Sequence, residues 1–195
     1  MVDLLNGVVT NVGGVGDELI SSVERGLCVL VGISRDDTPK DVEYIVRKIL
    51  NLRVFDDEQG KRWTKSVMDK NYEVLCISQF TLYSVLKGNK PDFHCSMGGD
   101  ESKRFYENFI TEMKKAYKSD FIKDGQFGAY MQVSIQNDGP VTITLESPVQ
   151  APKPDRRGGA RSREKVEKTG GNTNEGTGDP SGNQLTQNSG QAQNM

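Results

Sequence analysis

Histidine and cysteine, on which many catalytic and metal sites depend, are scarce in this sequence. It contains one histidine, His94, and three cysteines, none of them in a Cys-x-x-Cys pair. The odd number and the wide spacing argue against a disulfide framework and against a zinc site. Cys28, Cys76 and Cys95 are therefore expected to be reduced thiols.

Long apolar runs and an excess of charge of one sign are also lacking. The first twenty-five residues contain Asp3, Asp17, Glu18 and Glu24 and no long apolar segment. We therefore expect neither a signal peptide nor a membrane span, and we predict a cytoplasmic protein. The formal net charge of -2 at pH 7 argues against a protein that coats nucleic acid through a broad basic face, so any RNA contact is expected to be local.

Aromatic residues are absent from the last quarter of the chain. Residues 149–195 contain no Phe, Trp or Tyr and are dominated by Gly, Asn, Gln, Ser, Thr and Pro. Such a segment buries too little apolar surface to offset a backbone ordering cost of about 1–2 kcal/mol per residue. We predict a disordered tail over 149–195 and a single domain over 1–148. Between Lys153 and Lys168, seven basic residues outnumber three acids, which allows weak nucleic-acid contact by the tail.

Hydrophobic patterning predicts two buried strands and a helix in the domain. Residues 27–33 (LCVLVGI) and 74–80 (VLCISQF) are short apolar runs rich in β-branched residues, typical of strands covered on both faces. Thr38, Pro39 and Asp41 supply a hydroxyl cap, a proline at the first helical position and an acid three residues after the cap. A buried stripe follows at helical spacing: Val42, Ile45, Val46, Ile49 and Leu50.

Four weaker elements complete the predicted domain. Residues 52–55 read as a strand, and a second amphipathic helix is marked by Phe105, Phe109, Met113 and either Ala116 or Tyr117. Residues 130–135 and 141–145 read as two strands of a hairpin whose turn is Asn-Asp-Gly-Pro at 137–140. The order of elements predicts an α/β fold with helices on one side of layered, antiparallel-rich sheets.

The polar end of the second buried strand is the first candidate for chemistry. Ser78, Gln79 and Thr81 are hydroxyl and amide residues that a buried strand does not need, and ligands commonly sit at strand ends in α/β sheets. Free backbone N–H groups there would stabilise an oxyanion by roughly 3–4 kcal/mol per donor. The alternative is a structural turn in which the hydroxyls bond to the backbone.

His94 and the cysteines are weaker candidates. His94 lies in a predicted loop without a recognisable partner motif, so a structural loop histidine is favoured over a catalytic base. Cys28 and Cys76 lie within apolar strands, where burial favours the neutral thiol. Neither supplies the nucleophile and base of a conventional hydrolase.

Four motifs resemble the D-aminoacyl-tRNA deacylase family. They are SQFTL at 78–82, KGNKPDF at 87–93, FGAYM at 127–131 and QNDGPVT at 136–142. Their order and spacing cover most of the predicted domain. The resemblance implies a three-layer α/β/β fold, a homodimer, no metal, no cofactor, and hydrolysis of D-aminoacyl-tRNA and of glycine mischarged on tRNA.

The same resemblance implies the site residues. Ser78, Gln79, Phe80 and Thr81 would surround the ester and the α-amino group, with Thr81 positioning rather than attacking. The substrate-binding residues would be Ala129 and Met131 at the floor, together with Asn137, Gly139 and Pro140. In the family a Gly-cisPro pair, here Gly139 and Pro140, reaches into the neighbouring subunit's pocket and rejects L-amino acids by shape and lost hydrogen bonds.

Contact with the acceptor end of tRNA is expected from KGNK. Lys87 and Lys90, with Gly88 and Asn89 between them, would meet the phosphates, although solvated lysines are the alternative. With no triad in the sequence, the family's RNA-assisted chemistry, in which a ribose hydroxyl helps to activate water, is the expected mechanism.

One position departs from the resemblance, and it leaves other functions open. Gly7 stands where the family has an arginine thought to brace the Gly-Pro segment, which puts the rigidity of the pocket in question. A non-enzymatic nucleic-acid or partner-binding module acting through the basic tail is one alternative. A structural subunit with a degenerate pocket is the other, and the intact Gly139-Pro140 pair argues against it.

Overall fold

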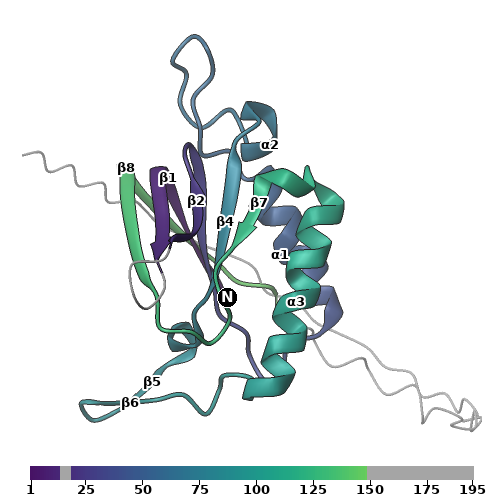
Figure 1. Ribbon diagram of the computed structural model, residues 1–195, viewed down its shortest axis with the longest axis vertical. Coiled ribbons are helices and arrows are strands. Elements are labelled where there is room, and N and C mark those ends of the chain that lie inside the picture. Colours follow the sequence, from purple (N-terminus) through teal and green to yellow (C-terminus); the bar gives the residue numbers. More distant parts are fainter. Residues whose placement is uncertain (14–18, 149–195) are drawn as a thin grey trace, which may run out of the picture. The chain divides into compact units, whose positions relative to one another are not determined.

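A computed structural model describes residues 1–13 and 19–148 (Figure 1). The predicted tail and its basic block lie outside these residues. The strands are β1 (Val2–Gly13), β2 (Leu19–Val23), β3 (Gly26–Val31), β4 (Glu73–Ser78), β5 (Val85–Lys87), β6 (Lys90–Asp92), β7 (Ile122–Asp124) and β8 (Gln132–Leu145). The helices are α1 (Pro39–Asn51), α2 (Val67–Lys70) and α3 (Gly99–Ala116), with 3-10 turns η1 (Phe80–Tyr83) and η2 (Ser119–Phe121). No helix among the described residues has the length and apolar composition needed to cross a membrane.

Six strands form one mixed sheet. Its order is β2-β1-β3-β4-β7, and β8 pairs with β1; β5 and β6 form a separate two-stranded ribbon. The predicted central strand is confirmed, because β3 pairs antiparallel with β1 and parallel with β4. The second predicted strand is confirmed as β4, which also pairs parallel with β7.

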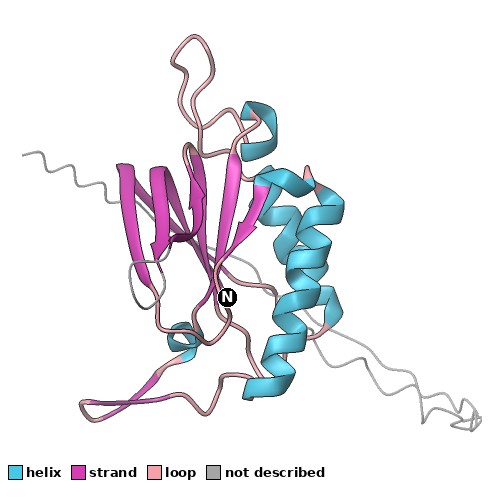
Figure 2. Cartoon of the chain, in the orientation of Figure 1, coloured by secondary structure: helices cyan, strands magenta, loops and turns pink. Residues whose placement is uncertain are grey.

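The two faces of the sheet carry two different apolar cores. Leu27 and Val29 of β3 pack in the larger core with α1 and α3, whereas Cys28 points into a smaller core on the opposite face. Val23 of β2 and Ile135 of β8 pack in that smaller core against β4, so the sheet folds over part of itself. Both long helices cover one side of the sheet (Figure 2). The predicted α/β fold with helices on one side is confirmed.

The two long helices form as their sequences predict. Thr38 is the N-cap of α1, and its backbone N–H and hydroxyl both donate to the carboxylate of Asp41, at 2.8 and 2.7 Å. The predicted stripe of α1 is buried in full. In α3 the buried stripe includes Phe109 and Met113 as expected, together with Tyr106 and Ile110, while Phe105 is only partly buried.

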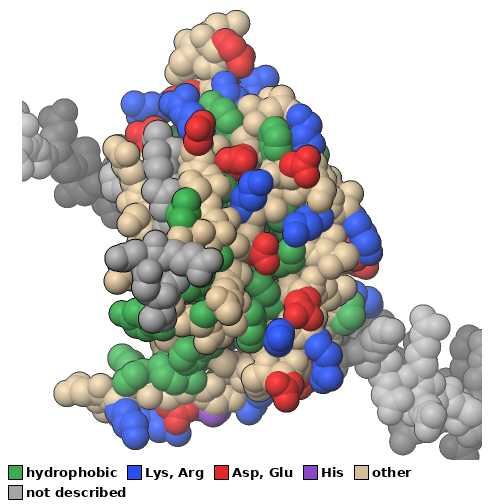
Figure 3. Space-filling model, in the orientation of Figure 1, with side chains coloured by type: hydrophobic (Ala, Val, Ile, Leu, Met, Phe, Trp, Pro, Cys, Tyr) green, Lys and Arg blue, Asp and Glu red, His purple; other side chains and the backbone are tan. Residues whose placement is uncertain are grey.

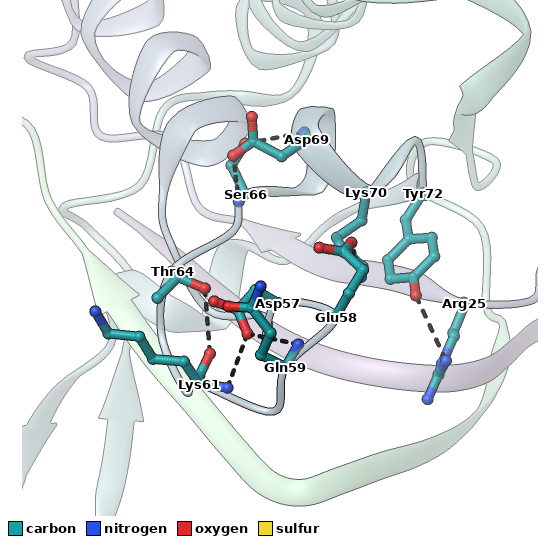
Figure 4. A network of polar contacts seen from close by, with 10 residues as sticks. All are labelled: Arg25, Asp57, Glu58, Gln59, Lys61, Thr64, Ser66, Asp69, Lys70 and Tyr72. Atoms are coloured by element: carbon teal, nitrogen blue, oxygen red, sulfur yellow. Dashed lines mark hydrogen bonds and ion pairs between the residues drawn. The ribbon is translucent and has the colours of Figure 1, made fainter.

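The predicted strand at 52–55 is wrong. Only Phe55 pairs, through an isolated bridge to Lys65. The loop that follows satisfies its own backbone, because the Asp57 carboxylate accepts from the N–H groups of Gln59 (3.0 Å) and Lys61 (2.9 Å), as Figure 4 shows. A neighbouring strand is therefore not needed there.

The predicted hairpin at 130–145 is also wrong. β8 runs without reversal, since both of its halves pair antiparallel with β1, Gln136 opposite Val9 and Thr142 opposite Leu5. Residues 138–141 form a bulge in β8, because they lie opposite the shorter stretch of β1 between Leu5 and Gly7. β1 is long enough to pair with both halves of β8. The turn-like composition of Asn-Asp-Gly-Pro gives no sign of this long-range pairing. Gly139 in the bulge has a φ of +114°, a value that favours glycine.

Candidate functional site

A cleft of about 630 Å³ lies at the carboxyl end of β4. Its walls are the last residues of β4 with the start of η1, the loop that leads into α3, and the segment 127–133 before and at the start of β8. Carboxyl ends of parallel strands are the usual ligand-binding edge of an α/β sheet. The cleft lies at the opposite end of β4 from the loop network of Figure 4, whose Ser66 and Tyr72 precede the strand.

The structure brings most of the predicted ester-binding residues to this cleft. Those that line it are Ser78, Gln79, Phe80, Ala129 and Met131. Thr81 is not among the lining residues. Its hydroxyl instead accepts a hydrogen bond from the side-chain amide of Gln79, so it can hold that amide in place.

The segment carrying these residues is held from three sides. The backbone N–H of Gln79 donates to the carbonyl of Val31 at 2.8 Å, which extends the β3–β4 pairing. The hydroxyl of Ser96 donates to the carbonyl of Phe80 at 2.9 Å. The rings of Phe80 and Phe93 meet edge to face, 4.9 Å between centroids. The start of η1 is therefore fixed to both the sheet and the loop before α3.

Two backbone N–H groups are available at the start of η1. Those of Phe80 and Thr81 have no hydrogen-bond acceptor within residues 1–13 and 19–148. They are the first residues of a 3-10 turn, where the N–H groups lack partners within the turn. The N–H of Phe80, a residue that lines the cleft, can donate to a developing oxyanion there, and the N–H of Thr81 follows it in the turn.

Large apolar side chains are exposed around the cleft. Phe80 is 58 % exposed and Tyr130 76 % exposed, and Leu86 of the nearby ribbon is 71 % exposed. Hydrophobic side chains gather at this end of the molecule in Figure 3, above and along the β5–β6 ribbon. Exposed apolar surface of this kind marks a binding face.

The predicted tRNA-contacting residues lie on the β5–β6 ribbon, which projects from the body of the fold (Figure 1). Gly88 and Asn89 form its tip, and Gly88 has a φ of +63°. Lys87 is paired with Asp92 at 2.6 Å, whereas Lys90 has no ion pair among the described residues. The two lysines thus differ in the charge that they offer to a phosphate.

The remaining predicted residues are not in the cleft of their own chain. Asn137 and Gly139 belong to the β8 bulge and do not line it. The Asn137 side chain closes the bulge by accepting from the N–H of Val141 (3.2 Å) and donating to the Thr142 hydroxyl (3.1 Å). Gly7 pairs with Asn137, so the departure from the family pattern lies at the base of the bulge that carries Gly139 and Pro140.

His94 is an exposed loop histidine with hydrogen-bond partners, as the sequence favoured. Its Nδ1 contacts the carboxylate of Asp92, and its Nε2 lies 3.4 Å from Sγ of Cys95. The spacing D-x-H-C is the sequence signal that went unused. The expectation of buried thiols is confirmed for Cys28 and Cys76, and burial raises the pKa of Cys28 to about 12.

Comparison with known proteins identifies relatives of this chain. Residues 8–146 match the family described as D-Tyr-tRNA(Tyr) deacylase. D-aminoacyl-tRNA deacylase 1 from Bos taurus and from Homo sapiens are 66 % and 65 % identical to this chain over 134 residues, 69 % of this chain and 64 % of each relative. This chain therefore spans less than two thirds of the length of those relatives.

Two solved structures have the same fold. One, titled c-Myc DNA Unwinding Element Binding Protein, is 59 % identical with a TM-score of 0.73, covering 75 % of this chain and 98 % of that one. The other, titled as a structural analysis of a probable eukaryotic D-amino acid tRNA deacylase, is 17 % identical with a TM-score of 0.66 over the same shares; its likeness concerns the fold alone. With the family matched over most of its length, this chain belongs to the D-Tyr-tRNA(Tyr) deacylase family.

Proposed function

We propose that this chain hydrolyses the ester that links a D-amino acid to transfer RNA. The observation that carries the proposal is the cleft at the end of β4, with the free N–H groups of Phe80 and Thr81 beside the side chain of Gln79. The relatives named D-aminoacyl-tRNA deacylase support it. A cytoplasmic location fits this substrate.

The chemistry follows from what the cleft offers. Attack of water on the ester carbonyl creates an oxyanion, to which the two N–H groups at the start of η1 would donate hydrogen bonds. Water would be activated with help from the ribose hydroxyl next to the ester, because a neighbouring group on the substrate is already in place. Thr81 would act by holding Gln79 rather than as a nucleophile.

The N–H of Phe80 is testable with a matched pair of variants. Phe80→Ala removes the ring and keeps the N–H, whereas Phe80→Pro removes both. Proline is tolerated here because Phe80 is the first residue of η1 and Gln79 before it is not helical, with φ -142° and ψ 85°. We expect kcat for D-tyrosyl-tRNA to be roughly a hundred- to a thousand-fold lower in Phe80→Pro than in Phe80→Ala. Equal kcat values would show that the N–H of Phe80 does not stabilise the oxyanion.

Handedness would be read by a second copy of the chain. We propose a homodimer in which the bulge with Gly139 and Pro140, as a Gly-cisPro pair, enters the partner's cleft and leaves no room for an L side chain. Two observations support this: Gly139 is exposed and does not line its own cleft, and the apolar surface with Phe80, Tyr130 and Leu86 is available for a partner.

Mixed dimers test this arrangement. A Phe80→Pro chain keeps an intact tip, and a Gly139→Val chain keeps an intact cleft but forces a side chain on a φ of +114°. If the tip enters the partner's cleft, the side chain added by Gly139→Val would block that cleft, so each variant alone is inactive. Co-refolded chains then regain about one quarter of the wild-type rate, since half of the dimers are mixed and each has one complete site. No recovery in mixtures that contain mixed dimers would contradict the arrangement.

Two finer points of specificity belong to the same proposal. Glycine mischarged on tRNA is the expected additional substrate, because a pocket that excludes an L side chain still admits a residue without one. Gly7→Arg places an arginine opposite Asn137, and we expect it to increase the ratio of D- to L-aminoacyl-tRNA turnover by stiffening the bulge. A lower ratio would mean that the bulge does not need a brace.

The structure titled c-Myc DNA Unwinding Element Binding Protein favours a second candidate function, DNA binding. The basic block between Lys153 and Lys168 would supply the charge. Removal of residues 152–195 separates the two functions: loss of DNA binding with unchanged deacylation assigns them to different parts of the chain. DNA binding that persists after the removal would show that residues 152–195 are not the DNA-binding segment.

A further inference from the structure

Three side chains with nucleophilic chemistry meet beside the cleft. Sγ of Cys95 lies 3.4 Å from Nε2 of His94, and the other ring nitrogen of His94 contacts Oδ1 of Asp92. This is a thiol next to a base that a carboxylate orients, the arrangement that activates cysteine nucleophiles. Neither Cys95 nor His94 has a part in the ester chemistry proposed above.

The carboxylate is fixed by a second partner. Oδ2 of Asp92 is 2.6 Å from Nζ of Lys87, while Oδ1 also accepts from the backbone N–H of His94 at 3.1 Å. The Lys87 hydrogen bond, followed by those from His94, holds the pKa of Asp92 well below its usual range. Asp92 therefore stays anionic, and the imidazole keeps its orientation with Nε2 toward the sulfur.

Only one of the three cysteines is accessible in this way. Cys28 and Cys76 are fully buried, and burial raises the pKa of both thiols. Cys95 is only partly buried, and its carbonyl accepts from the N–H of Arg35 at 3.1 Å, which holds its backbone in place. The residues on either side of the His94–Cys95 pair, Phe93 and Ser96, line the cleft.

We propose that Cys95 is a modification site at the edge of the cleft, a nucleophilic thiol served by His94 and Asp92 that forms a mixed disulfide with small disulfides of the glutathione type. The substituent would be carried between Phe93 and Ser96, next to the hydrogen bond from Ser96 to the Phe80 carbonyl. This inference does not depend on the proposed deacylase activity, since it concerns the thiol itself.

The reaction balances without a further reagent. The Cys95 thiol gives its proton to Nε2 of His94, and the thiolate attacks one sulfur of the disulfide, forming the Cys95–sulfur bond and breaking the sulfur–sulfur bond of the reagent. The departing thiolate takes the proton from the imidazolium and leaves as a thiol. Cys95 is oxidised, and half of the reagent is reduced.

The test uses the full chain, oxidised glutathione and, as a second probe, iodoacetamide. Mass spectrometry is expected to find one addition per chain, on Cys95, and none in Cys95→Ser. At pH 7 we expect His94→Gln to react with iodoacetamide about five- to thirty-fold more slowly, because the variant lacks the base next to Sγ of Cys95. Asp92→Asn is expected to slow the reaction in the same direction.

A structural effect is separated from this role by pH. Near pH 10 hydroxide in the solvent can take the proton that His94 takes at neutral pH, so the rates of wild type and His94→Gln are expected to converge there. Cys76→Ala is the control and should label like wild type at both pH values. Equal rates at pH 7, a difference that persists near pH 10, or labelling of Cys28 or Cys76 first would each overturn the proposal.

Discussion

Replacing Gly32 by alanine tests whether the end of β3 sets the position of the segment that forms the cleft. A Cβ at position 32 would lie 2.9 Å from Cβ of Leu82, 3.2 Å from Cδ2 of Tyr83 and 3.3 Å from the carbonyl oxygen of Gln79. Carbon atoms pack best at about 3.5–4.0 Å. The methyl group would therefore have to push η1 away from β3.

The expected size of the effect follows from that displacement. The contact with Leu82 is roughly 0.6–1.1 Å too short for ordinary packing, and overpacking of this kind costs about 1–3 kcal/mol of stability. The same shift moves the N–H groups of Phe80 and Thr81, and a displacement near 1 Å at a catalytic group can lower the rate by about a hundred-fold. We expect kcat to fall by roughly ten- to a hundred-fold.

Deacylation of D-tyrosyl-tRNA and thermal unfolding of the same preparation measure the two effects. Lys103→Ala is the control, because Lys103 is an exposed residue of α3 that does not line the cleft. A Gly32→Ala chain with wild-type kcat at a temperature where it is folded would refute the reasoning, since it would mean that the placement of η1 does not govern the site.

Three further substitutions test the parts of the fold that hold this site. Tyr106→Phe removes a buried hydroxyl that donates to the Cys76 carbonyl at 2.9 Å. We expect urea unfolding to show a free energy of unfolding lower by about 1–3 kcal/mol. An unchanged free energy would contradict a stabilising role for this bond. Gly26→Ala makes a Cβ overlap the carbonyl of Glu73, so β3 and β4 must separate and no cooperative thermal transition is expected. Asp69→Asn removes a carboxylate that accepts from the N–H and hydroxyl of Ser66 at 2.8 and 2.9 Å, bonds that hold the Asp69 pKa below its usual value. This stabilisation is present above about pH 4 and is lost as the pH falls through the native pKa, so the difference from wild type should shrink on acidification; a constant difference would contradict the assignment.

Local patterns were enough to predict the elements whose signals lie within a few residues. The cap and stripe of α1 and the apolar runs of β3 and β4 follow from helical and strand periodicity alone, and the structure confirms them. Leu27 and Val29 alternate with Cys28 between two cores because successive side chains of a strand point to opposite faces. The polar residues at the end of β4 are likewise a local signal, because they break the apolar run of that strand.

Long-range pairing decided the rest. The Asn-Asp-Gly-Pro segment has the composition of a turn, yet β1 pairs with β8 on both sides of it, and the segment becomes a bulge. The ion pair between Lys87 and Asp92 depends on the β5–β6 ribbon, which brings the two side chains together. Residue types and their local spacing are enough to identify which residues are apolar, capped or reactive. Which of them come into contact is known only from the folded chain, because contacts between distant residues depend on strand register and not on local preference.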